Sequence, residues 1–119
     1  LVPVERCFTL YQTVKYIIKN NIQGDLVECG VWKGGSSMLM AYILKDAGEN
    51  NRKIYLYDTF EGMTKPGDMD GQEEKEQWEQ GRVTDTLNNM CYSPIEEVKA
   101  NMERTGYPAE KIIMVKGKV

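Results

Sequence analysis

The residues with the clearest capacity for chemistry lie in the stretch 24–37, which reads GDLVECGVWKGGSS. Four of them, Glu28, Gly30, Gly34 and Ser36, form the pattern E-x-G-x-x-x-G-x-S. Glycines in a turn can adopt positive φ and let the backbone approach a ligand. Ser36 or its neighbour Ser37 can then cap a helix whose N-terminal end carries partial positive charge. A strand, a glycine turn and a helix start predict a site for a nucleotide-like small molecule; a turn used only for packing is the alternative.

The details of the turn narrow the class of ligand. Trp32 stands where the dinucleotide-binding fingerprint has its second glycine, and Gly35-Ser36 stands where a phosphate-binding P-loop needs Lys followed by Ser or Thr. Glu28 closes the apolar run, and its negative charge would repel a pyrophosphate. The same charge suits a positively charged group, such as the ammonium of a methionine moiety.

Asp58 is the second candidate binding residue. It follows the strand-like run Lys53–Tyr57 and lies 23 residues after Gly35. In nucleotide-binding folds an acid about 20 residues beyond the glycine turn meets the ribose hydroxyls, because a carboxylate can accept two hydrogen bonds from a vicinal diol. A solvated acid at a strand end is the alternative, which the combination with the glycine turn disfavours.

The elements that must position these residues alternate between helix and strand. Helical spacing of apolar residues predicts a helix from about Glu5 to Asn20, and a second helix runs from the glycine turn to Gly48. Ser93-Pro94-Ile95-Glu96 resembles a capping box at the start of another helix. Strands are predicted at about 25–29, 53–57 and 111–115. The order predicts an α/β fold: a partial doubly wound parallel sheet with flanking helices, the first strand central, truncated after the third strand.

Composition excludes several classes of protein. The net charge of −3 argues against a nucleic-acid binder, and no apolar run is long enough for a membrane span. Three widely spaced cysteines argue against a disulfide framework or a CxxC metal site, and no secretory signal is visible, so a cytoplasmic location is expected. The chain has no histidine, so any proton transfer must use other side chains.

Two stretches, DLVECGVWKGGS at 25–36 and YDTFEGM at 57–63, resemble the macrocin O-methyltransferase family, and the likeness extends over nearly the whole chain. Its members use S-adenosylmethionine, and several methylate sugar hydroxyls of natural products. The resemblance implies a Rossmann-like methyltransferase fold. The residues that it assigns to the cofactor are Glu28, Gly30, Gly34 and Ser36 for the methionine part, and Asp58 and Thr59 for the ribose. For the polar region 64–90, which includes a predicted short helix at 73–82, it implies a mobile lid; a surface insertion is the alternative.

Residues 1–119 therefore look like the N-terminal cofactor-binding half of a class I methyltransferase domain. The family is about twice this length, and its magnesium-binding aspartates and much of its substrate pocket lie in the other half, so no catalytic residue or metal ligand is identified. The expected activity of the parent protein is methyl transfer to a small-molecule hydroxyl, such as one on a natural-product sugar. The isolated chain is expected to be inactive.

Self-association to a homo-oligomer is expected, because the continuous apolar run Ile112–Val115 predicts a strand buried on both faces. Two other classes of function stay open. One is a non-catalytic interaction module that keeps the fold. The other is a nucleotide-dependent oxidoreductase half-domain, which Trp32 in the glycine turn disfavours.

Overall fold

The computed structural model describes residues 3–61, 76, 79–80 and 93–118. Most of the predicted lid region 64–90, and most of the helix predicted within it at 73–82, lie outside the described residues. The elements, in chain order, are α1 (Val4–Lys19), β1 (Leu26–Cys29), α2 (Gly35–Asp46), β2 (Ile54–Asp58), α4 (Ile95–Glu103), the 3₁₀ helix η1 (Ala109–Lys111) and β3 (Ile112–Lys116). The predicted strands are confirmed to within one residue at each end.

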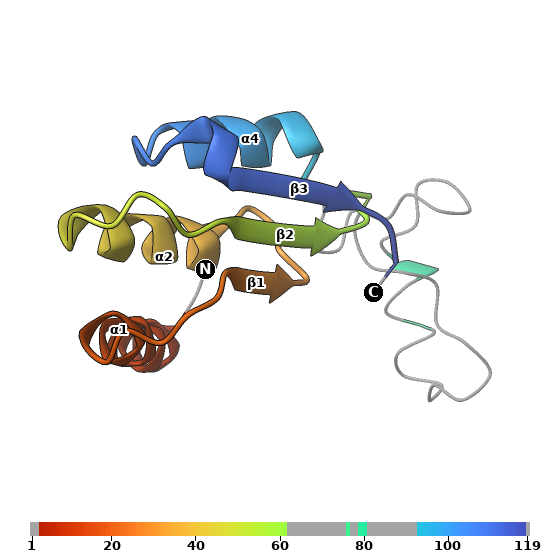
Figure 1. The fold of residues 1–119 in the computed structure, drawn as a ribbon. Coiled ribbons are helices and arrows are strands. Elements are labelled where there is room, and N and C mark those ends of the chain that lie inside the picture. Colours follow the sequence, from red (N-terminus) through yellow and green to blue (C-terminus); the bar gives the residue numbers. More distant parts are fainter. Residues whose placement is uncertain (1–2, 62–75, 77–78, 81–92, 119) are drawn as a thin grey trace.

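The three strands form a parallel sheet in the order β1-β2-β3, with Leu26 opposite Ile54 and Ile54 opposite Ile112 (Figure 1). The α/β class with a parallel sheet is thereby confirmed. The prediction that the first strand is central is wrong, because β2 lies between the other two in the described sheet. In the doubly wound order 3-2-1-4-5-6, strand 1 gains its second neighbour only from a fourth strand.

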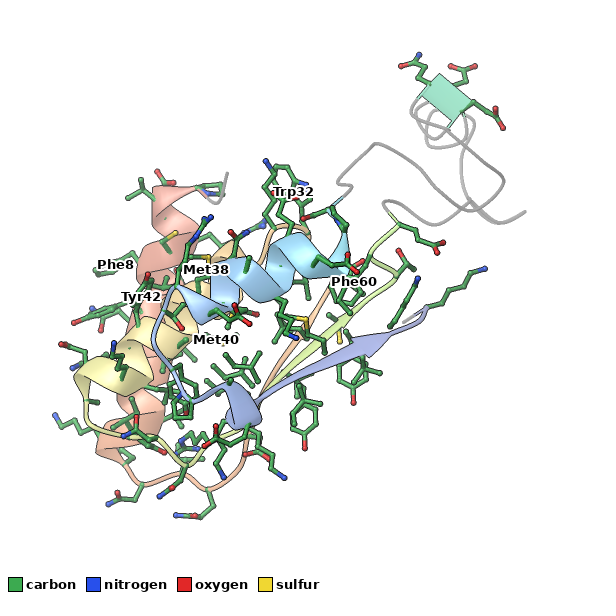
Figure 2. All side chains as sticks on the ribbon, turned by 90° about the horizontal axis from the view of Figure 1, so that it is seen from above. Phe8, Trp32, Met38, Met40, Tyr42 and Phe60 are labelled. Atoms are coloured by element: carbon green, nitrogen blue, oxygen red, sulfur yellow. The ribbon has the colours of Figure 1, made fainter. Side chains whose placement is uncertain are left out.

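One face of the sheet carries the core. Leu26, Ile54 and Leu56 point to this face and are 9%, 0% and 0% exposed, because alternate residues of a strand face opposite sides. Helices α2 and α4 lie on the same side of the sheet, with α1 beside α2 (Figures 1 and 2). On the other face Tyr55 and Tyr57 stack with ring centroids 6.4 Å apart.

Strand β3 is only half-buried along Ile112–Val115, whereas its apolar run predicts burial on both faces. The helices α2 and α4 lie on one side of the sheet (Figures 1 and 2), so they leave its other face uncovered. Strand β3 is also an edge strand of the described sheet, with β2 as its neighbour on one side. The self-association expected from this run stays a prediction.

The helix starts differ from the predicted ones. Helix α2 is capped by Gly34, whose φ is 87°, and no side chain caps it, so Ser36 and Ser37 lie inside its first turn. The capping box predicted at Ser93 is also wrong. The Ser93 hydroxyl donates to the carboxylate of Glu97 at 3.0 Å instead of accepting a backbone N–H. Among the described residues, no helix has both the length and the apolar character to cross a bilayer.

The amino ends of β1 and β2 are held together by charged side chains. The Asp25 carboxylate accepts the backbone N–H of Lys53 at 2.9 Å. The Arg52 guanidinium donates to the carbonyl oxygens of Gly24 and Ile22, both at 2.6 Å, and pairs with Glu49 at 2.5 Å. These contacts join β1 and β2 at the edge of the sheet opposite their carboxyl ends.

We expect Leu56→Ala to lower the free energy of unfolding by about 2–5 kcal/mol, because it leaves a cavity between the sheet and α2. Val27→Ala, on the neighbouring strand at a residue that is 57% exposed, should cost less than about 1 kcal/mol. Urea denaturation of the two variants measures both effects. Equal losses would contradict the assignment of the core to one face of the sheet.

Candidate functional site

The site lies at the carboxyl edge of the sheet, where β1 and β2 end side by side. The N–H of Gly30, the first residue after β1, donates to the carbonyl of Tyr57 at 2.9 Å, and β2 ends at Asp58. Because the strands are parallel, all their carboxyl ends point the same way (Figure 1). The pairing therefore brings Asp58 and Thr59 next to the glycine turn that follows β1, as the sequence predicts.

The turn itself spans residues 30–34 and packs closely on α4. Gly30 and Gly34 both have positive φ, 82° and 87°. A Cβ on Gly34 would lie 3.4 Å from the Val98 side chain, whereas a Cβ on Gly30 would have no atom of the described residues within 4 Å. Gly34 is thus set against the core, and Gly30 borders open space in which a ligand can approach the backbone.

Glu28 projects from β1 toward the start of α2, where its carboxylate accepts a hydrogen bond from the hydroxyl of Ser37. Ser37 is fully buried. Burial raises the pKa of Glu28, the hydrogen bond from Ser37 opposes this shift, and the nearby charge of Asp58 adds to it. Glu28 is thus a carboxylate held in a position where a positive partner would stabilise its charged form.

Asp58 is the most heavily bonded side chain of the site. One carboxylate oxygen, Oδ2, accepts the backbone N–H groups of Val31 at 2.6 Å and Trp32 at 3.0 Å. The other, Oδ1, accepts the N–H of Phe60 at 3.0 Å, with the Thr59 hydroxyl at 3.4 Å. The carboxylate therefore joins the end of β2 to the turn after β1.

Two aromatic residues beside Asp58 adopt left-handed backbone conformations: Trp32 has φ 51° and Phe60 has φ 56°. This conformation is an outlier for bulky residues and costs on the order of 1–3 kcal/mol each. Phe60 is buried at 5% exposure, whereas Trp32 is 38% exposed (Figure 2). The Lys33 ammonium lies 5.5 Å from the centre of the Trp32 ring.

Two residues of the site are missing from the sequence-based assignment. The Ser37 hydroxyl donates a hydrogen bond to Glu28. Helix α2 begins at Gly35, two residues earlier than a cap at Ser36 would place it, so both serines lie in its first turn. Asn101 of α4 donates its amide to the carbonyl of Lys33 at 2.9 Å. Asn101 and Lys33 are 68 positions apart in the sequence, and no local sequence pattern predicts such a contact.

Known proteins resemble this chain over most or all of its length. The family model for macrocin-O-methyltransferase (TylF) matches residues 1–119. A Streptomyces olivaceus protein, 8-demethyl-8-(2,3-dimethoxy-alpha-L-rhamnosyl)-tetracenomycin-C 4'-O-methyltransferase, is 32% identical over 117 residues, which cover 98% of this chain and 43% of that protein. Demethyldecarbamoylnovobiocin O-methyltransferase of Streptomyces niveus is 37% identical over 68 residues, or 57% of this chain and 26% of that one.

A solved structure supports the same grouping. The O-methyltransferase NovP superposes with a TM-score of 0.81 at 28% sequence identity, covering 98% of this chain and 46% of that chain. The chain thus spans less than half the length of these relatives. The shared region contains the three parallel strands, the glycine turn and the carboxyl edge described above. With a family match over its whole length, the chain belongs to the macrocin O-methyltransferase family.

Proposed function

We propose that this chain is the N-terminal, cofactor-binding half of an S-adenosylmethionine-dependent O-methyltransferase domain. The single observation that carries the proposal is the carboxyl edge of the sheet, where Glu28, the open side of Gly30 and Asp58 meet. The names of the relatives, all O-methyltransferases, support it. Their greater length supports the assignment of this chain to one part of the domain.

The residues present fit this cofactor. The Glu28 carboxylate accepts the hydroxyl of Ser37, and hydrogen bonding from the Ser37 backbone and the Ser36 side chain also favours its charged form. Of its roughly four lone-pair positions, at least one is left for the ammonium of a methionine moiety. Gly30, Gly34 and Ser36 would border that moiety, and the open space at Gly30 admits it. The ribose side would lie toward Asp58 and Thr59. When bound, the cofactor supplies an electrophilic methyl group, and this half of the domain would hold it in place for an acceptor.

For the acceptor we propose a hydroxyl of a small molecule, with a sugar of a natural product as the first class to test. This rests on a relative whose printed name includes a rhamnosyl group methylated at a 4'-oxygen. In such a transfer the acceptor oxygen would take the methyl group from the cofactor's sulfur, and the hydroxyl proton would go to a base. None of the described residues is assigned as that base.

The first test is cofactor binding by the complete protein, measured by isothermal titration calorimetry with S-adenosylhomocysteine. We expect Glu28→Gln to weaken binding by about 10- to 100-fold, because a hydrogen bond to a charged group contributes about 1.5–3 kcal/mol. Glu110→Gln, on the exposed η1, is the matched control and should leave the affinity unchanged.

The same titration separates the two alternatives. Binding of NAD in place of S-adenosylhomocysteine would support an oxidoreductase half-domain, and binding of neither would support an interaction module. Either result would overturn the proposed function. Transfer of a labelled methyl group to a panel of sugar-bearing acceptors, run with the complete protein, then tests the acceptor class.

Without cofactor, Glu28→Gln should make the protein more stable at neutral pH. In the folded protein the pKa of Glu28 lies above its ordinary value of 4.5, chiefly because the carboxyl group is buried. The folded protein therefore binds a proton at Glu28 more tightly than the unfolded chain does. The ionisation of Glu28 therefore lowers the free energy of unfolding as the pH rises from 4.5 through the raised pKa. Above that pKa, where Glu28 is ionised in the folded protein, this loss of stability has reached its full size. The neutral amide lacks this term and can still accept the Ser37 hydrogen bond.

Thermal melts from pH 4 to pH 8 measure the effect. The melting temperatures of the two proteins should nearly coincide at the acid end. The glutamine variant should melt at a higher temperature than the wild type at neutral pH. A difference that is constant over the whole range would contradict the burial of Glu28 as its cause.

A further inference from the structure

The hydrogen-bond capacity of Asp58 is nearly exhausted by the protein itself. A carboxylate offers about four lone-pair positions. Three of them accept the backbone N–H groups of Val31, Trp32 and Phe60 at 2.6–3.0 Å, and the Thr59 hydroxyl lies near the fourth at 3.4 Å. A vicinal diol needs two free positions. Direct contact with both ribose hydroxyls would thus leave at least one backbone N–H without its partner, which is costly in a partly buried site.

The three bonded amides have a common feature: they belong to the two segments that border the site. Trp32 and Phe60 are the residues held in the left-handed conformation, and Val31 is the buried first side chain of the turn. Hydrogen bonds to an ionised acceptor are roughly twice as strong as those between neutral groups. The carboxylate is therefore placed to hold both strained residues at once.

The turn has a second support that does not involve a charge. The Asn101 amide holds the Lys33 carbonyl at 2.9 Å, and Gly34 packs against Val98. Asp58 thus holds the first part of the turn from β2, while α4 holds the last part. The backbone beside Gly30, which borders the open side of the site, depends on Asp58 for its position.

We propose that Asp58 is a positioning residue: its carboxylate fixes the turn at Val31 and Trp32 and serves cofactor binding through that turn, not by hydrogen bonds to the ribose. This inference rests on the proposed function. It assigns Asp58 a role different from the direct ribose contact that the family resemblance implies.

Two ligands distinguish a positioning role from direct ribose contact: S-adenosylhomocysteine, and its analogue with 2′-deoxyribose in place of ribose. Both are titrated calorimetrically into the complete protein. We expect Asp58→Ala to weaken the binding of both by the same factor, about tenfold or more, because it displaces the turn that contacts the cofactor. The preference for ribose over deoxyribose should be retained. Asp25→Ala removes a carboxylate that also accepts a strand-end N–H, at the opposite edge of β1 and β2, and should change neither affinity more than about twofold.

If Asp58→Ala loses affinity for S-adenosylhomocysteine alone, and so binds it and the 2′-deoxyribose analogue equally, the proposal is overturned. Such a result would establish direct contact between Asp58 and the ribose. Wild-type protein that binds neither compound would overturn the proposed function instead. In that case the turn-fixing role is judged by the second measurement, which needs no cofactor.

The second measurement is amide hydrogen exchange followed by NMR in Asp58→Asn, a variant of nearly equal shape that also serves if Asp58→Ala does not fold. The amide protons of Val31 and Trp32 should exchange faster than in the wild type, while those of β2 and β3 stay protected. Asp25→Asn is the matched control. Unchanged exchange at Val31 and Trp32 would overturn the proposal.

Discussion

Two hydrogen bonds, from the N–H groups of Val31 and Trp32 to the Asp58 carboxylate, tie the end of β2 to the turn that follows β1. They exist because β1 and β2 pair in parallel with Cys29 opposite Tyr57, so that each strand's next residues meet at one edge. A shift of one residue in this register would turn the Asp58 side chain to the opposite face of the sheet. The candidate site therefore depends on the packing of the sheet that sets this register.

Glu28 is a residue of this site that lowers the stability of the folded protein. Its carboxylate lies partly buried against Ser37, and burial raises its pKa, so the protein without cofactor keeps a charge in a place that disfavours it. Trp32 and Phe60 add backbone strain beside it. Features that oppose stability tend to gather at functional sites, where a ligand offsets them. This agrees with the position of all three residues at the carboxyl edge.

The predicted features that failed have two different causes: a competing side-chain partner for the serines, and the rest of the sheet for the first strand. A serine next to a glycine turn and a Ser-Pro-x-Glu pattern both satisfy the local rules for capping. In the structure, however, Ser37 and Ser93 donate to Glu28 and Glu97. The prediction that the first strand is central is wrong because the neighbours of a strand are set by the whole sheet.

By itself, the sequence determined the alternation of helices and strands, the parallel α/β class, the positions of Glu28, Gly30 and Asp58 at strand ends, and the family. These follow from apolar spacing, glycine placement and local motifs, which act over a few residues. Only the tertiary structure decided that Asp58 bonds to the turn 27 positions away along the chain, and that Asn101 supports it from α4. The physical reason is that a hydrogen bond between distant segments requires the packed sheet to bring donor and acceptor within about 3 Å, and no local pattern encodes that distance.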